Sequence, residues 1–210
     1  RGMEAYHVQE GKNIKLATGT QLMAQDRAIV DEAYAGDIIG LFDPGIFSIG
    51  DTLCAPGKKF RFDPIPTFAP EHFKRVRSLD TMKRKQFLKG MEQIAQEGAI
   101  QIFKTPYTGM EEVIVGVVGT LQFDVLEYRL KNEYNVELYM EGLPYEYLRW
   151  IETDDGEPVK EEDLILGTDV KLVEDYKGNQ LLLFGSQWAI GWTEERNKNL
   201  TFHEFGGTKF

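Results

Sequence analysis

Residues 72 to 139 switch repeatedly between the hydrophobic period of a strand and that of a helix, and this alternation restricts the fold most. Strands are predicted at HFKRVRSL (72–79), AIQIF (99–103), EEVIVGVVG (111–119) and residues 136–139. Apolar positions spaced by three and four residues indicate helices between 80 and 98 and between 120 and 135. The order βαββαβ is typical of a ferredoxin-like α/β sandwich, so an α+β fold is expected.

Specific residues mark where the two helices begin and end. Asp80 and Thr120 are predicted N-caps, because their side-chain oxygens can accept a hydrogen bond from an unpaired backbone amide. Gly98 is expected to end the first helix, and Asn135 in a left-handed conformation is expected to end the second. Gly119 is expected to let the chain leave the sheet tightly.

The first 63 residues have a different pattern, with short apolar runs separated by glycine. Strands are predicted at 37–41 and 51–54, with Gly36, Asp37, Gly50 and Asp51 serving turns. Many short strands joined by glycine-rich turns favour a barrel or a sandwich.

A cluster of prolines separates this part from the βαββαβ segment. Pro64, Pro66 and Pro70 resist both a helix and a central strand, so a domain boundary is expected near residue 64. The predicted domains are residues 1–63, β-rich, and residues 64–210, an α/β sandwich with an extension from about 151.

The extension begins with the acidic, turn-rich stretch TDDGEPVKEEDL. It is expected to form a further strand, helix and strand packed on the second domain. A turn is predicted at 177–179, and Ser186 is a predicted N-cap for a short helix through Trp188 and Trp192. Both tryptophans, with Trp150, are expected to pack between the acidic stretch and the sheet.

Charge is unevenly distributed along the sequence. The net charge is −10, yet residues 58–89 carry ten basic and three acidic side chains, which leaves −17 for the remainder. A basic region of this kind can bind phosphates by releasing counterions, but a solvated face is the favoured interpretation from the charge pattern alone. The candidate contact residues for RNA or for a neighbouring domain are Lys58, Lys59, Arg61, Lys74, Arg75, Arg77, Lys83 and Arg84.

Four phenylalanines, Phe60, Phe62, Phe68 and Phe73, lie within the same basic region. They can stack on bases, but their alternating spacing is also explained by packing in a core, which is the favoured interpretation.

Motifs for catalysis and for metal binding are absent from the sequence. There is no G-x-x-x-x-G-K-[ST] phosphate loop, no G-x-S-x-G elbow and no zinc spacing, so no cofactor or metal is expected in this chain. The single Cys54 is predicted to be a buried, inert thiol, and an intracellular setting is favoured. No apolar run is long enough to cross a bilayer.

Three stretches carry a resemblance to translation factors. AYAGDIIGLFDPGIFSIGDTLC (33–54) resembles the second half of the β-barrel domain that follows the GTPase domain. GTLQFDVLEYRLKNEYNVE (119–137) is similar to the start of the next domain in the elongation-factor-G group, but has Gln-Phe-Asp where that group has Leu-His-Leu-Glu. FAPEHFKRVRSLDTMKRKQFLKGMEQIAQEGAIQIF (68–103) is similar to class II peptide-chain release factors.

The resemblance implies a C-terminal part of a translational GTPase, with a barrel that is incomplete at its N-terminus. A complete member would bind GTP or GDP with Mg²⁺ in its GTPase domain. It would bind the ribosome through small-subunit RNA and a ribosomal protein, and promote departure of a class I release factor in the cytoplasm. The alternatives are a fragment of an elongation-factor-G-like or ribosome-protection GTPase, a free-standing interaction module, or a small hydrolase.

Overall fold

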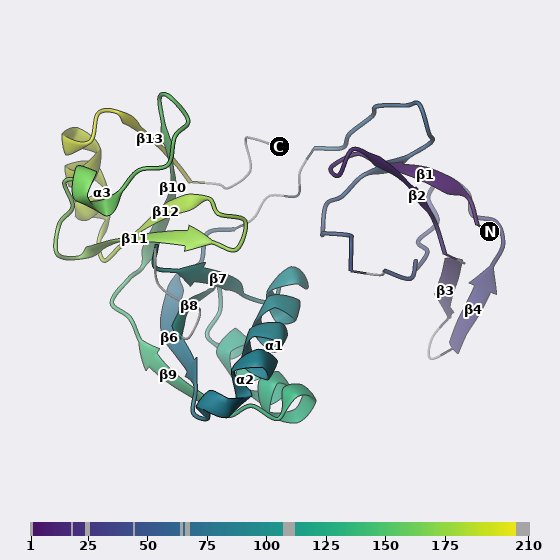
Figure 1. Ribbon diagram of the computed structural model, residues 1–210, viewed down its shortest axis with the longest axis horizontal. Helices are drawn as coiled ribbons and strands as arrows, with labels where there is room; N and C mark the ends of the chain where they lie inside the picture. The colour runs from purple at the N-terminus through teal and green to yellow at the C-terminus, as the bar shows by residue number, and fades with distance from the viewer. Residues whose placement is uncertain are drawn as a thin grey trace. The chain divides into compact units, whose positions relative to one another are not determined.

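The computed structural model describes residues 2–17, 19–23, 26–43, 45–63, 65, 68–106 and 112–204 (Figure 1). The chain divides into two compact units, residues 1–65 and residues 66–209. Where burial is described in the first unit, only Ala5, His7 and Thr52 are fully buried. The second unit contains three clusters of buried apolar side chains.

The first unit consists of two small antiparallel sheets. The described strands of one sheet are ordered β2-β1-β5, and the other sheet is the hairpin β3-β4. The strands are β1 (Glu4–His7), β2 (Lys12–Lys15), β3 (Gly19–Met23), β4 (Asp26–Val30) and β5 (Leu53–Cys54). The strand predicted at 51–54 is therefore reduced to its last two residues.

The strand predicted at 37–41 does not form. Gly40 makes an isolated bridge with Thr20, and Ile38 is 88% exposed. The Asp37 carboxylate accepts a hydrogen bond from the Tyr34 backbone amide at 2.7 Å, so a local turn takes the place of a ladder. The prediction was wrong because an apolar run alone does not supply a neighbouring strand.

The second unit begins with the predicted βαββαβ order. The four strands of this first half are ordered β7-β8-β6-β9, and each neighbouring pair is antiparallel. Its elements are β6 (His72–Ser78), η1 (Thr81–Lys83), α1 (Arg84–Gln96), β7 (Gln101–Lys104), β8 (Glu112–Val117), α2 (Leu121–Tyr134) and β9 (Leu138–Gly142).

The C-terminal half continues the same sheet instead of packing on it as a separate strand, helix and strand. Its strands are ordered β13-β10-β12-β11, and β11 joins the first half through the pairs Glu174↔Lys104 and Asp175↔Phe103. Among the described residues, the sheet thus contains eight strands. The elements of this half are β10 (Tyr147–Thr153), η2 (Glu161–Asp163), β11 (Val170–Asp175), β12 (Gln180–Phe184), α3 (Gln187–Arg196) and β13 (Leu200–His203).

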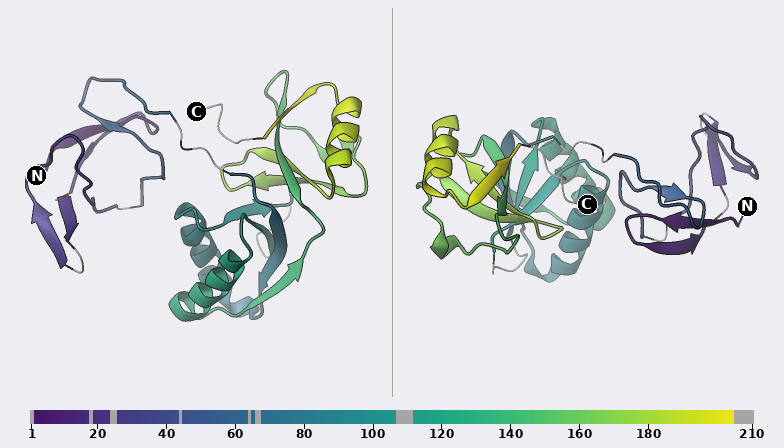
Figure 2. Two further views of the ribbon diagram at one scale, coloured as in Figure 1. Left: turned by 180° about the vertical axis from the view of Figure 1, so that it is seen from behind. Right: turned by 90° about the horizontal axis from the view of Figure 1, so that it is seen from above.

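Alternation along β8 explains how the first half of the sheet is covered on both faces. Val113, Val115 and Val117 belong to the core that α1 and α2 complete. Ile114 lies between them on the other face and belongs to a different core. The helices α1 and α2 lie together beside this half, and α3 lies beside the other half (Figure 1, Figure 2).

The strand β12 repeats this arrangement in the second half. Leu182 packs in the core that includes α3, whereas Leu181 and Leu183 point to the opposite face. There they join Phe73 and Phe103 from the first half, so the two halves of the sheet pack against each other in a third core. Burial on both faces explains the unbroken apolar run of β12.

Four of the predicted helix-end residues act as expected. Gly98 follows the end of α1 in a left-handed conformation, and its amide donates to the Ala95 carbonyl at 2.9 Å. The Asp80 carboxylate accepts a hydrogen bond from the Met82 amide at 2.9 Å, at the start of the short turn that leads into α1. Asn135 ends α2 in the left-handed conformation. Ser186 Oγ accepts a hydrogen bond from the Ala189 amide at 3.3 Å and caps α3.

The predicted cap of α2 was wrong. Thr120 has helical backbone angles and its hydroxyl caps no amide. Instead, Gln122 Oε1 accepts hydrogen bonds from the amides of Val118 and Gly119, at 3.0 and 2.9 Å, and Gln122 Nε2 donates to the Ala99 carbonyl. A Cβ at Gly119 would meet open space, so this glycine is not required for close packing.

Candidate functional site

The segment Lys58–Lys59–Phe60–Arg61–Phe62, called the KKFRF segment below, presents cations and aromatic rings to solvent. Lys58 and Lys59 are exposed, and Phe60 and Phe62 are 55% and 65% exposed. The two rings pack edge to face with centroids 4.8 Å apart. A pair of exposed rings between cations is the type of surface that single-stranded nucleic acid can contact.

Two hydrogen bonds hold the ends of the KKFRF segment to β5 and to the residue directly before it. Cys54 Sγ donates to the Lys58 carbonyl at 2.7 Å, and the Phe62 amide donates to Thr52 Oγ1 at 3.2 Å. Because Thr52 is buried, the backbone is fixed while the rings and cations point outward. Cys54 itself is partly buried, where a fully buried thiol was predicted.

The core interpretation of the four phenylalanines is therefore wrong for three of them. Phe68, like Phe60 and Phe62, is largely exposed, at 69%. Phe73 alone among the four is buried, in the third core of the second unit. Alternating spacing predicted a buried face, but the KKFRF segment has no neighbouring strand among the described residues that would cover that face.

The basic side chains of β6 separate to its two faces. Lys74 Nζ lies 4.4 Å from the ring centroid of Phe123, on the face covered by α1 and α2. On the other face, Arg75 pairs with Glu141 at 3.2 Å, and Arg77 lies over the ring of Tyr139, one strand away. Alternation along a strand thus divides these residues between two surfaces.

Lys83 and Arg84 lie where η1 passes into α1. Lys83 Nζ donates to the Asn135 carbonyl at 2.6 Å, beside the C-terminal end of α2. A cation at this end compensates the helix dipole, so Lys83 has a structural role there. Arg84 is exposed at the first residue of α1.

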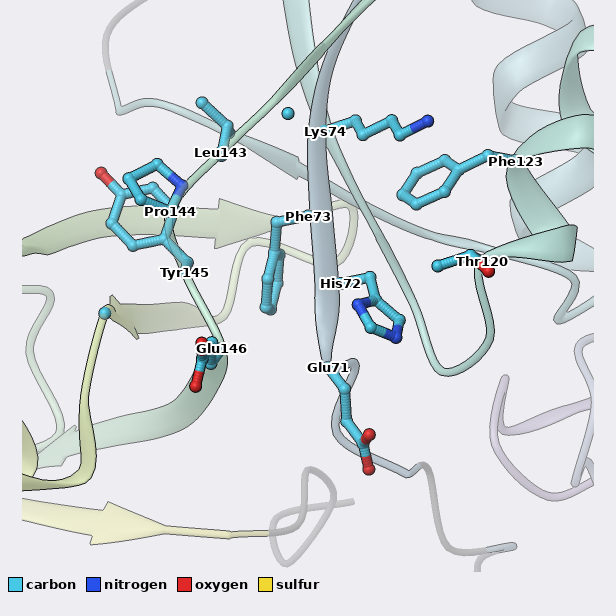
Figure 3. Close-up of a pocket in the computed structure, with 12 residues that line it drawn as sticks. Glu71, His72, Phe73, Lys74, Thr120, Phe123, Leu143, Pro144, Tyr145 and Glu146 are labelled. Atoms are coloured by element: carbon cyan, nitrogen blue, oxygen red, sulfur yellow. The ribbon is translucent and has the colours of Figure 1, made fainter.

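A cleft of about 470 Å³ lies beside the start of β6 (Figure 3). Its walls come from the start of β6, the start of α2, the connection between β9 and β10, and the end of β12. Figure 3 shows Lys74 beside the ring of Phe123 on one side of β6 and Phe73 on the other. Burial raises the pKa of Tyr145, another lining residue, which keeps its phenol protonated.

The three histidines lie in different places. His7 Nε2 is 2.8 Å from Asp51 Oδ2 in the first unit, and His72 lines the cleft. His203 Nε2 lies 3.5 Å from Glu152 Oε2 on neighbouring strands. Within the described ranges, no group of three or more histidine, cysteine or acidic side chains is arranged to hold a metal ion.

Trp188 does not pack between the acidic stretch and the sheet as predicted. It is 72% exposed on α3, while Trp192 is partly buried and Trp150 lies against the third core. The spacing of residues 189, 190 and 193 could have predicted the exposure of Trp188. These three residues form the buried face of so short a helix, and Trp188 lies outside it.

Two family models match the sequence. The model described as "Class II release factor RF3, C-terminal domain" matches residues 62–194, and the model described as "Elongation factor G domain 2" matches residues 1–56. The match over residues 62–194 favours the release-factor interpretation over a fragment of an elongation factor.

Curated relatives named "Peptide chain release factor 3" are similar to nearly the whole chain. The protein from Symbiobacterium thermophilum is 49% identical over 202 residues, which is 96% of this chain and 37% of that protein. The proteins from Listeria welshimeri and Gloeobacter violaceus are 46% and 41% identical, over 95% and 97% of this chain. The chain spans 37–38% of the length of these relatives.

In the part of the chain that the structure describes, no helix has the length and apolar character needed to span a bilayer.

Proposed function

The chain belongs to the release factor 3 family of class II release factors, and from this premise we propose that it is a ribosome-docking part of a translation termination factor. The KKFRF segment is the single observation that carries the docking proposal. It places cations and two rings on a surface whose backbone is fixed at both ends. Its partner in this proposal is ribosomal RNA of the small subunit.

The charge of the chain supports a local contact and argues against general binding to RNA. With a net charge of −10, the chain as a whole repels a phosphate backbone. Contact is therefore restricted to surfaces where basic side chains dominate. Base stacking on Phe60 and Phe62 adds about 1–3 kcal/mol per base, which compensates for the small number of phosphate contacts.

The basic residues of the second unit have a secondary part in this proposal. Arg75 and Arg77 lie on the face of β6 away from α1 and α2, and Lys74 lines the cleft. Arg84 is exposed at the start of α1. These residues are candidates for contact with the ribosome or with a GTPase domain of the same longer protein.

We further propose that the first unit is part of a translation-factor β-barrel and the second a ferredoxin-like sandwich with an extended sheet. The domain boundary proposed near residue 64 follows from the prolines at 64, 66 and 70. In the longer protein, binding of GTP or GDP with Mg²⁺ to another domain would drive departure of a class I release factor. This function requires ribosomes, so the proposed location is the cytoplasm.

Cosedimentation of the chain with ribosomes across a series of salt concentrations tests the docking proposal. The double variant Lys58→Glu, Lys59→Glu is expected to bind at least tenfold more weakly at low salt, because it reverses two phosphate contacts. The matched control Lys160→Glu, Lys198→Glu makes the same charge change on the C-terminal half and is expected to bind as the unmodified chain does.

Two further variants separate stacking from charge. Phe60→Ala and Phe62→Ala are expected to weaken binding without changing its salt dependence, because they remove rings and leave every cation in place. Binding that is equally strong in all four variants, or absent from the unmodified chain at low salt, would remove the KKFRF segment as a docking site.

A further inference from the structure

The exposed side of α3 carries two tryptophans and an arginine spaced by one helical turn. Trp188 and Trp192 have ring centroids 6.3 Å apart with planes inclined by 38°. The guanidinium of Arg196 lies 4.0 Å from the ring centroid of Trp192, and its Nη1 donates to the Trp192 carbonyl. The three side chains form a ladder, called the α3 ladder below, that runs along the helix.

The α3 ladder is not needed to hold α3 on the sheet. Ala189, Ile190 and Thr193 face the core and are buried. Trp188 begins the ladder at 72% exposed, and one face of its ring has no described partner comparable to Arg196. An exposed tryptophan of this size is unusual on a protein surface and is typical of binding sites, where tryptophan often supplies much of the affinity.

Acidic side chains lie on α3 and at both of its ends. Glu194 and Glu195 are exposed on the helix itself. At the C-terminal end, two hydrogen bonds join Asn197 to Ile165, which lies two residues after η2. The three residues of η2 are all acidic. At the N-terminal end, Ser186 Oγ lies 3.3 Å from Asp169 Oδ2.

The same sign of charge extends over the whole C-terminal half. Residues 143–204 contain fourteen acidic and six basic side chains, a net charge of −8 with histidine neutral. A phosphate backbone would be repelled by such a surface, whereas a chain rich in arginine or lysine would be attracted. Charge complementarity thus selects a basic protein segment over a nucleic acid as the occupant.

We propose that the α3 ladder is a docking site for an arginine-rich protein segment. One arginine of the partner stacks on the open face of the Trp188 ring, as Arg196 already stacks on Trp192. Glu195 and the acidic residues of η2 attract the remaining cations. Arginine is preferred over lysine because its planar guanidinium can lie parallel to an indole ring. This site is separate from the KKFRF segment and has the opposite charge.

Fluorescence anisotropy with a labelled short peptide of alternating arginine and serine tests the proposal on the 210-residue chain. Trp188→Ala is expected to weaken binding of this peptide by about fivefold, since a cation–π contact at an exposed site is lost. Tyr128→Ala removes an equally exposed ring from α2 and is the matched control, with no expected change. The corresponding lysine peptide is expected to bind more weakly than the arginine peptide.

Two additional measurements make the outcome decisive. The indole N–H resonance of Trp188 is expected to shift when the arginine peptide is added, which does not depend on any variant. Glu195→Gln is expected to reduce the salt dependence of binding. Equal peptide affinity of the unmodified chain and Trp188→Ala would overturn the proposal, as would a shift of the Trp188 resonance by oligouridine and not by the peptide.

Discussion

The contact between α1 and α2 depends on Gly90, and replacing it with alanine tests how tightly the two helices pack. A Cβ at this position would overlap Leu130 Cδ2 and lie 2.9 Å from Tyr134 Cδ2. Leu130 is completely buried, and the Tyr134 hydroxyl donates to Gln93 Oε1 at 2.7 Å. Neither neighbour can move aside without disturbing other contacts.

Two effects of opposite sign determine the stability of Gly90→Ala. Alanine is favoured over glycine inside a helix by about 1 kcal/mol. Overpacking a well-filled core costs about 1–3 kcal/mol. For Gly90→Ala alone, the change in unfolding free energy is too close to zero to be decisive. A second variant is needed that gains the helix preference of alanine without overpacking the core.

Gly191→Ala is that second variant. Gly191 lies inside α3, and a Cβ there would have no neighbouring atom within 4 Å. It is expected to stabilise the second unit by up to about 1 kcal/mol. Because the helix preference cancels in the comparison, Gly90→Ala should be less stable than Gly191→Ala by about 1–3 kcal/mol.

Urea unfolding followed by far-ultraviolet circular dichroism measures this difference. The α-helices found in the described residues all belong to the second unit, so the helical signal reports on its unfolding. A change in midpoint at constant slope gives the difference in free energy. If Gly90→Ala proves as stable as Gly191→Ala, the inference that α1 and α2 pack too closely at Gly90 to admit a Cβ is wrong.

Four further substitutions have defined outcomes. Gln122→Ala should destabilise the second unit by about 1–2 kcal/mol in urea unfolding, because its side chain bonds two backbone amides directly before α2 and the Ala99 carbonyl. Thr120→Ala should cost much less, because the Thr120 hydroxyl caps no amide. Arg129→Met should cost at most about 1 kcal/mol at neutral pH, since the ion pairs of Arg129 are partly exposed. Arg129 lowers the pKa of Glu97 below its usual 4.5, so the stabilisation from this ion pair is present above pH 4.5 and is lost as the pH falls through the lowered pKa. Acid titration should therefore show the stabilities of the unmodified chain and Arg129→Met converging. Asp51→Ala leaves Nε2 of the buried His7 without its partner, which weakens β1. Hydrogen exchange of the backbone amides of residues 4–7 should therefore accelerate by about one order of magnitude or more.

The elements of the second unit were predictable where apolar residues recur at a regular spacing. β6 and α1 appear close to where the spacing of apolar residues places them. Asn135 ends α2 because it tolerates the left-handed conformation, which is a local property. Local properties of this kind are visible in a sequence.

Features that depend on distant residues were not predictable in the same way. Among the described residues, the run at 37–41 is apolar but pairs at a single bridge. Thr120 stands at the start of α2 but has helical backbone angles, so its hydroxyl caps no amide. The continuation of the sheet through β11 needs pairing with β7, about seventy residues earlier in the chain, and no local pattern encodes such a partner. The exposure of Trp188 likewise follows from which face of α3 meets the core.

The third core has a mechanical consequence for the second unit. Among the described residues, the two halves of its sheet share two ladder pairs at the junction of β7 with β11, and so short a ladder would by itself allow the halves to bend against each other. Phe103 on β7 and Val173 on β11 also pack in the same buried core, so apolar contacts join the two halves. Rotating one half would expose that layer at about 25 cal/mol per Å² of apolar surface. A force applied at the β13 edge is therefore expected to move the whole sheet, including the β9 edge, as one rigid body, with little bending between the two halves.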